Sequence, residues 1–188
     1  AGLYQLRFGA PVLAGGLVVV GGIAGEVLGF STTGQRVWRS GALEREGLAS
    51  GVQPGQLLTV YEQAVALVPH GDDVLVSASN GMLLCLAASS GVERFRFVPS
   101  ERAPVLETQP YIRGRGNALT RAAVGCGRIF VGGACGRAWC LDGSTGRLLA
   151  ELEATSSVLA SPVVHDDGSA TVADHDGGVR RWSPCTSR

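Results

Sequence analysis

The sequence predicts an all-β protein, a β-propeller of four-stranded antiparallel blades, with about four repeats along its 188 residues. Two observations lead to this fold class. The chain holds 28 glycines, which separate short apolar runs, and this pattern is typical of many turns and many short strands. The chain also repeats itself, and a repeat of about 40 residues with four short strands has the size of a propeller blade.

The clearest repeat pairs residues 16–30, GLVVVGGIAGEVLGF, with residues 127–141, GRIFVGGACGRAWCL, and the two segments align without a gap. Weaker copies in the same frame lie at residues 72–86 and 168–182. Each copy has an apolar or β-branched run, then a link ending in glycine, then a second apolar run. These lengths predict two strands joined as a hairpin.

The other two strands of each repeat flank this hairpin. Short segments precede it, APVL at residues 10–13 and ASPVV at residues 160–164, and they predict the first strand. The second run of the hairpin is apolar at successive positions, so it must be covered on both faces, as in a sheet between two other sheets. A turn ending in glycine follows, and the predicted fourth strand then carries Trp38, Phe95 and Ala150 at the equivalent position of three repeats.

The length of the chain suits a single domain over residues 1–188. Residues 1–8, AGLYQLRF, resemble a fourth strand without its blade. They either close a four-blade ring onto the last repeat or are a stray strand in a segment of a larger propeller, and we favour the segment. The predicted repeats lie near residues 9–40, 60–98, 118–154 and 156–188.

Composition excludes two classes of partner. The formal net charge is +0, whereas binding to nucleic acid needs a basic face, so we expect no nucleic acid. The apolar stretch near residues 10–30 nearly has the length of a membrane-spanning helix. Its glycines and its gapless twin, which carries Arg128 and Arg137, instead predict two strands and a turn, so we expect no membrane span.

Cysteine usage bears on the compartment. The chain has five cysteines, an odd number, and no Cys-x-x-Cys pair, so zinc-finger and thioredoxin chemistry are not supported. A reducing compartment suits this pattern better than an oxidising one. We therefore expect a cytoplasmic location, with an extracytoplasmic one as the alternative.

Three segments carry a resemblance to a known family. CLDGSTGRLLA at residues 140–150 and GFSTTGQRVW at residues 29–38 resemble the repeat of the pyrroloquinoline-quinone-like (quinoprotein-type) β-propellers. SPVV at residues 161–164 is similar to another part of that repeat. In that family the aromatic residue at the end of the motif packs blade against blade. The resemblance implies this role for Trp38 and for Phe95, whereas Ala150 departs from the pattern.

Within that family, the turns and strand cysteines most resemble the C-terminal propeller of beta-alanine-activating enzymes of the acyl-CoA synthetase family. Quinone-binding members use adjacent cysteines over the cofactor, and more blades to surround it. No Cys-Cys pair occurs in this sequence. The resemblance therefore implies no pyrroloquinoline quinone and no other cofactor.

Few residues are candidates for chemistry or binding. An irregular polar insert, TQPYIRGRGN at residues 108–117, carries Tyr111, Arg113 and Arg115. Tyrosine and arginine are frequent anchors of interfaces, so these three are the candidate contacts with a partner, and a plain solvated loop is the alternative. Cys85 and Cys140 share a repeat position with Gly29, which indicates that they are small space-filling residues rather than nucleophiles.

The carboxylate-rich stretches HDDG at residues 165–168 and DHDGG at residues 174–178 present oxygen atoms that could ligate calcium. Both stand where the repeat needs a turn, and Asp-Gly is a common turn pair, so we predict turns and no metal site. None of the three histidines has a serine or cysteine partner that the sequence identifies, so no catalytic residue is predicted.

These observations predict a non-catalytic propeller that acts as a protein-interaction or regulatory module. The resemblance implies that it is the C-terminal part of an adenylate-forming, acyl-CoA-synthetase-like multidomain enzyme, with a protein partner or the other domains of the same polypeptide as its ligand. The alternatives are a scaffold subunit of an outer-membrane protein assembly machine, or a fragment of a quinone-dependent dehydrogenase.

Overall fold

The computed structural model describes residues 10–21, 26–43, 64–78, 81–99 and 119–183. Every helix or strand in these ranges is a β-strand, and each sheet is antiparallel with its strands in chain order, which confirms the predicted fold class. We call the four sheets blades 1 to 4. Blade 1 consists of β1 (Val12–Ala14), β2 (Leu17–Gly21), β3 (Val27–Phe30) and β4 (Arg36–Ser40). Blade 2 consists of β5 (Ala64–His70), β6 (Asp73–Ala78), β7 (Leu83–Ala87) and β8 (Glu93–Phe97), and blade 3 of β9 (Ala123–Gly125), β10 (Arg128–Gly133), β11 (Arg137–Asp142) and β12 (Leu148–Glu153). Blade 4 consists of β13 (Val163–Val164), β14 (Ala170–Ala173) and β15 (Val179–Trp182).

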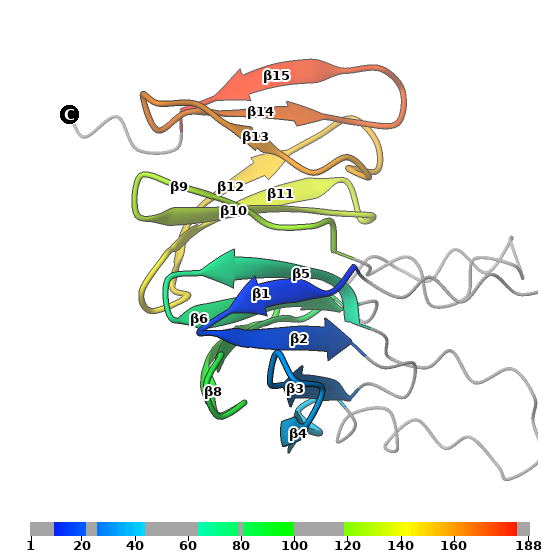
Figure 1. Cartoon of the computed structure of the whole chain (residues 1–188). Helices are drawn as coiled ribbons and strands as arrows, with labels where there is room; N and C mark the ends of the chain where they lie inside the picture. Colours follow the sequence, from blue (N-terminus) through cyan, green and yellow to red (C-terminus); the bar gives the residue numbers. More distant parts are fainter. Residues whose placement is uncertain (1–9, 22–25, 44–63, 79–80, 100–118, 184–188) are drawn as a thin grey trace, which may run out of the picture.

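The blades are stacked face to face in chain order, with blades 2 and 3 between blades 1 and 4 (Figure 1). Between blades 1 and 2, β5 contacts β1 and β2, and between blades 3 and 4, β9 contacts β13. The apolar stretch that could have been a membrane helix contributes β2 and β3 instead. In the described ranges, no helix is long and apolar enough to cross a membrane.

The repeat is visible in the backbone as well as in the sequence. In blades 1 to 3 the pairing of the third and fourth strands shifts register at the same step, a β-bulge beside Gly29, Cys85 and Cys140. The following turn ends in a glycine with φ of +86°, +70° and +69° in the three blades, at Gly34, Gly91 and Gly146. This left-handed conformation favours glycine, which explains why glycine recurs at this point of the repeat.

The hydrophobic core lies between the blades rather than within one of them. One cluster joins blades 1 and 2, a second joins blades 2 and 3, and two smaller clusters join blades 3 and 4. All five residues of β7 are buried, as the successive apolar positions of its sequence predict. A sheet in the middle of the stack must bury both faces, and a continuous apolar strand does so.

Trp38 joins blade 1 to blade 2. Its ring packs over Gly91 of the next blade and over Gly29 of its own β3, and a methyl group at either glycine would overlap the indole. Its Nε1–H donates a hydrogen bond of 2.9 Å to the carbonyl oxygen of Ala88 in blade 2. The expected role of Trp38 in packing blade against blade is therefore confirmed.

Phe95 takes the same place between blades 2 and 3. Its ring lies over Gly146, the glycine that corresponds to Gly91. Phenylalanine has no N–H to donate to the next blade. Here the contact is made by His70, whose Nε2 lies 2.6 Å from the carbonyl oxygen of Gly143. Gly143 is the residue of blade 3 that corresponds to Ala88 of blade 2. In blade 3 the position is Ala150, which packs at the edge of the smaller cluster with blade 4.

Residues 1–8, predicted as a stray or ring-closing strand, lie outside the described ranges.

Candidate functional site

A polar groove opens between blades 2 and 3, at the edge of the stack where the turns between first and second strands lie. Its volume is about 650 Å³. Blade 2 contributes the β5–β6 turn and a residue of β8, and blade 3 contributes two turns. The groove is lined by His70, Gly71, Asp72, Asp73, Arg94, Gly127, Gly143 and Ser144.

His70 links the two walls of the groove. It ends β5, and Gly71, with φ of +59°, turns the chain back into β6. The contact of the His70 ring with Gly143 crosses from blade 2 to blade 3. The amide N–H of Gly143 in turn donates 2.8 Å to the carbonyl oxygen of Gly127, so the two turns of blade 3 are also joined. One contact therefore joins the two blades at the groove, and one hydrogen bond joins the two turns of its blade 3 wall.

The charges in the groove have both signs. Arg94 Nε lies 3.5 Å from Asp73 Oδ1, and both side chains are partly exposed, so this ion pair is worth little to stability. Asp72 is exposed beside them. The groove thus offers donors and acceptors to a ligand on a rigid backbone, which is the usual arrangement of a binding site carried by loops.

The rim of the groove at Ser144 is held by a carboxylate. Asp142 Oδ1 accepts hydrogen bonds from the backbone N–H groups of Ser144 and Thr145, at 3.1 and 2.9 Å, and from their hydroxyls, at 2.7 and 2.8 Å. These bonds, with the Ser144 hydroxyl first, hold the pKa of Asp142 well below its usual range. The turn fixes where the Ser144 side chain stands in the groove.

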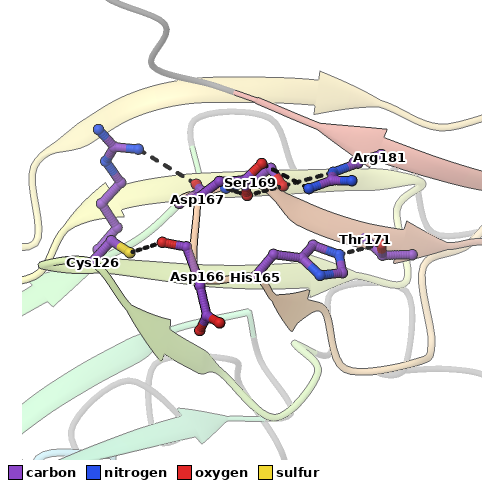
Figure 2. A network of polar contacts seen from close by, with 9 residues as sticks. Cys126, His165, Asp166, Asp167, Ser169, Thr171 and Arg181 are labelled. Atoms are coloured by element: carbon purple, nitrogen blue, oxygen red, sulfur yellow. Dashed lines mark hydrogen bonds and ion pairs between the residues drawn. The ribbon is translucent and has the colours of Figure 1, made fainter.

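A second polar network lies between blades 3 and 4 and occupies the HDDG stretch (Figure 2). Asp167 Oδ1 accepts hydrogen bonds from the backbone N–H of Ser169, at 3.0 Å, and from its hydroxyl, at 2.6 Å. Arg181 Nη2 lies 2.7 Å from the other carboxylate oxygen. The thiol of Cys126 in blade 3 donates to the carbonyl oxygen of Asp166, at 3.6 Å.

The DHDGG stretch is also a turn. Asp174 accepts a hydrogen bond of 2.7 Å from the backbone N–H of Gly178, and its other oxygen accepts one of 2.7 Å from the Thr155 hydroxyl. The prediction that both carboxylate-rich stretches form turns is confirmed. Within the described ranges, histidine, cysteine and carboxylate side chains form no group of three or more suited to a metal ion.

Asp167 gives a testable dependence of stability on pH. The bonds from Ser169, and then the charge of Arg181, lower the pKa of Asp167 from 3.8 to about 2. A lowered pKa stabilises the folded state above pH 3.8, and this contribution is lost as the pH falls through about 2. We expect Asp167→Asn to lower the melting temperature at pH 7, and the difference from the wild type to close between pH 4 and 2.

The control for this experiment is Asp176→Asn, at an exposed position of the next turn. Its melting temperature should follow the wild type at each pH. A difference for Asp167→Asn that is the same at pH 7 and pH 2 would contradict the role of the Asp167 charge.

Cys85 and Cys140 fill space, as predicted. Both are fully buried and neither forms a disulfide. Each lies opposite the residue at the aromatic position in the strand pairing, Cys85 opposite Phe95 and Cys140 opposite Ala150. Burial raises the pKa of the Cys85 thiol to about 12, and the charge of Asp73 adds to the rise. The thiolate needed for nucleophilic chemistry is therefore suppressed. Cys126 and Cys135, which flank β10, are also free.

The burial of these thiols predicts their reactivity. In the folded protein at pH 8, iodoacetamide should modify Cys126, which is exposed, and leave Cys85 and Cys140 unmodified until denaturant is added. Peptide mapping by mass spectrometry separates the sites. Modification of Cys85 at the rate of Cys126, with the circular dichroism spectrum unchanged, is the result that would contradict the assigned burial.

Tyr111, Arg113 and Arg115, the residues predicted from sequence as a partner contact, lie outside the described ranges. Sequence analysis missed the groove. The sequence contains a signal for it. The second repeat has Phe95 where the first has Trp38, and the first strand of that second repeat ends in His70.

Comparisons with known proteins support the fold. No protein-family model and no curated protein sequence matches the chain. Among solved structures it is similar to BamB from Moraxella catarrhalis, with a TM-score of 0.65 and 18% identity over 96% of this chain and 50% of BamB. It is also similar to two computationally designed proteins. Ika4 matches with a TM-score of 0.67 and 20% identity over 96% of this chain and 92% of Ika4. Ika8 matches with a TM-score of 0.66 and 19% identity over 93% of this chain and 45% of Ika8. The chain thus spans about half the length of BamB. These neighbours are propellers, and the chain has a β-propeller fold.

Proposed function

We propose that the chain is a non-catalytic propeller module that binds protein, either a separate partner or the other domains of its own polypeptide. The groove between blades 2 and 3 supports this proposal most directly. It combines exposed turns, charges of both signs and a backbone held by the bonds of His70 and Asp142. A polar surface on a rigid scaffold suits the rim of a protein interface.

The resemblance of the turns to the acyl-CoA synthetase branch supports a finer proposal. In this proposal the module belongs to an adenylate-forming, beta-alanine-activating enzyme and contacts its adenylation or carrier domain in the cytoplasm. The likeness to BamB supports a propeller interaction module more generally, and it favours the second candidate, a scaffold subunit of an outer-membrane assembly machine outside the cytoplasm. Neither candidate needs pyrroloquinoline quinone.

Binding measurements test the proposal. The purified adenylation and carrier domains of a beta-alanine-activating acyl-CoA synthetase are titrated into the chain by isothermal calorimetry. The variant is Arg94→Ala, which removes a partly exposed charge from the groove, and the control is Arg36→Ala, an exposed arginine of β4. We expect Arg94→Ala to weaken binding about tenfold, or ~1.4 kcal/mol, and the control to bind like the wild type.

Absence of binding would overturn the acyl-CoA synthetase context. In that case, binding to a purified outer-membrane barrel-assembly complex with the same loss in Arg94→Ala would support the scaffold. Binding that both variants retain in full would contradict the assignment of the groove as the contact surface.

A further inference from the structure

The edge of the stack that is open as a groove between blades 2 and 3 is closed between blades 1 and 2. There Gly15 of blade 1 packs onto blade 2, and a methyl group added to it would lie 3.0 Å from the side chain of Ala88. The equivalent of Gly15 in blade 2 is Gly71, and in the described part of the chain no atom lies within 4 Å of a methyl group added there. Gly143 replaces Ala88 in blade 3. The pair that closes this edge between blades 1 and 2 is therefore missing at the groove.

The turn between β5 and β6, which lines the groove, differs in shape from its equivalents. The turns of blades 1 and 3 have a positive φ at both residues, and the second residue is Gly16 in one and Gly127 in the other. In the blade 2 turn, which the structure describes in full, only the first residue, Gly71, has a positive φ. The second position can then carry a side chain without strain, and it holds Asp72.

The charges of the groove are peculiar to blade 2. Asp73 stands where blade 1 has Leu17, and Arg94 stands where blade 1 has Val37. The positions of Asp72 and Asp73 hold no carboxylate in any of the other three repeats. Blade 1 forms the same four-stranded sheet without any of these charges. The repeat does not need them to fold, and departures of this kind are expected at functional sites.

Two of these charges are open to a ligand. In the described part of the chain the Asp72 carboxylate takes part in no hydrogen bond or ion pair. Within the same ranges, the ion pair of Arg94 is made by Nε alone, 3.5 Å from Asp73 Oδ1, and the Arg94 side chain is 59% exposed. The groove thus presents one carboxylate without a cation and one guanidinium that is weakly held.

The lining of the groove favours a polar chain segment over a small apolar ligand. Sites for small molecules are lined mainly by hydrophobic and aromatic side chains. This groove is lined instead by glycine, aspartate, arginine, serine and histidine. Complementary charges give such a surface its specificity for a protein partner.

We propose that the groove receives a segment of the protein partner in which a basic side chain is followed closely by an acidic one. The basic side chain pairs with Asp72, and the acidic side chain pairs with Arg94. This inference rests on the proposed role of the groove as a protein contact, and it names the chemistry of that contact. Because the pairs form between exposed charges, salt should weaken them.

A titration followed by NMR tests this chemistry without any partner domain. The isotope-labelled chain is titrated with a blocked pentapeptide of glycine in which lysine is the second residue and glutamate the fourth. We expect the amide resonances of Gly71, Asp72 and Ser144 to shift, and the shifts to shrink as the salt concentration rises from about 0.05 to about 0.5 M. An all-glycine peptide of the same length should leave these resonances in place.

Two variants copy blade 1, which shows that the fold accepts the new residues. Asp72→Gly copies Gly16, and Arg94→Val copies Val37. Each should weaken peptide binding about two- to fivefold, which corresponds to the loss of one exposed ion pair. The matched control is Asp176→Gly, which removes a carboxylate from an exposed turn of blade 4 and should bind like the wild type. Circular dichroism verifies that all three variants fold.

The possible outcomes separate this inference from the proposed function. A peptide that leaves the groove resonances in place, or that binds both variants as tightly as the wild type, overturns the inference. Domain binding that depends on Arg94 would in that case leave the proposed function standing. If the peptide binds as expected while neither the synthetase domains nor the barrel-assembly complex binds, the chemistry of the groove stands and the proposed partners are wrong.

Discussion

Replacing Trp38 with alanine is expected to lower the free energy of unfolding by about 3–5 kcal/mol, because it removes a large buried side chain and leaves a cavity. Trp38 is 8% exposed and has the largest side chain that joins blade 1 to blade 2. Its loss also leaves the carbonyl oxygen of Ala88 without the indole N–H. Urea unfolding followed by fluorescence and circular dichroism measures the change.

The matched control is the neighbouring residue of the same strand. Val37 is 53% exposed, so Val37→Ala should stay within about 0.5 kcal/mol of the wild type. If the two variants lose the same stability, Trp38 does not join the blades in the way described.

The second large effect concerns the fit between Trp38 and Gly29. In the three blades with four strands, the residue opposite the aromatic position is smallest where the aromatic is largest: glycine faces Trp38, and cysteines face Phe95 and Ala150. Gly29→Cys alone should overpack this contact and cost about 1–3 kcal/mol. Combining it with Trp38→Phe copies the pair of blade 2 and relieves the overlap.

A double-mutant cycle measures this relief. We expect the double variant to lose less free energy of unfolding than the two single variants lose together. The difference should be at least about 0.5 kcal/mol, as is usual for residues in contact. Strict additivity of the two changes would show that the size of the residue at position 29 is not set by the indole.

The repeat explains why the blades could be predicted from sequence. The gapless match of residues 16–30 with 127–141 separates the strands from their turns, and the glycine before Trp38 marks the start of the fourth strand. The carboxylate turns at Asp167 and Asp174 were predicted for the same reason. These features depend on local spacing, which the sequence contains.

The groove and the exposure of the outer face of blade 1 could not be predicted in this way, because they depend on how the blades pack against one another. His70 and Gly143 are far apart in the chain, and no spacing within one repeat connects them. Val18 and Val74 have the same place in the repeat, yet the first is partly exposed and the second fully buried. Periodicity tells which way a side chain points in a blade, and it does not tell whether another blade lies there.

The central claim is that the sheets pack as consecutive blades through an aromatic side chain set on a glycine of the next turn. Nuclear Overhauser effects of the isotope-labelled chain test it most directly. The account predicts a contact between the indole protons of Trp38 and the α-protons of Gly91, and an equivalent contact between Phe95 and Gly146. The α-proton resonances of both glycines should be shifted upfield by the ring current of the aromatic side chain above them. Assigned spectra in which neither contact is present would contradict the packing of the blades.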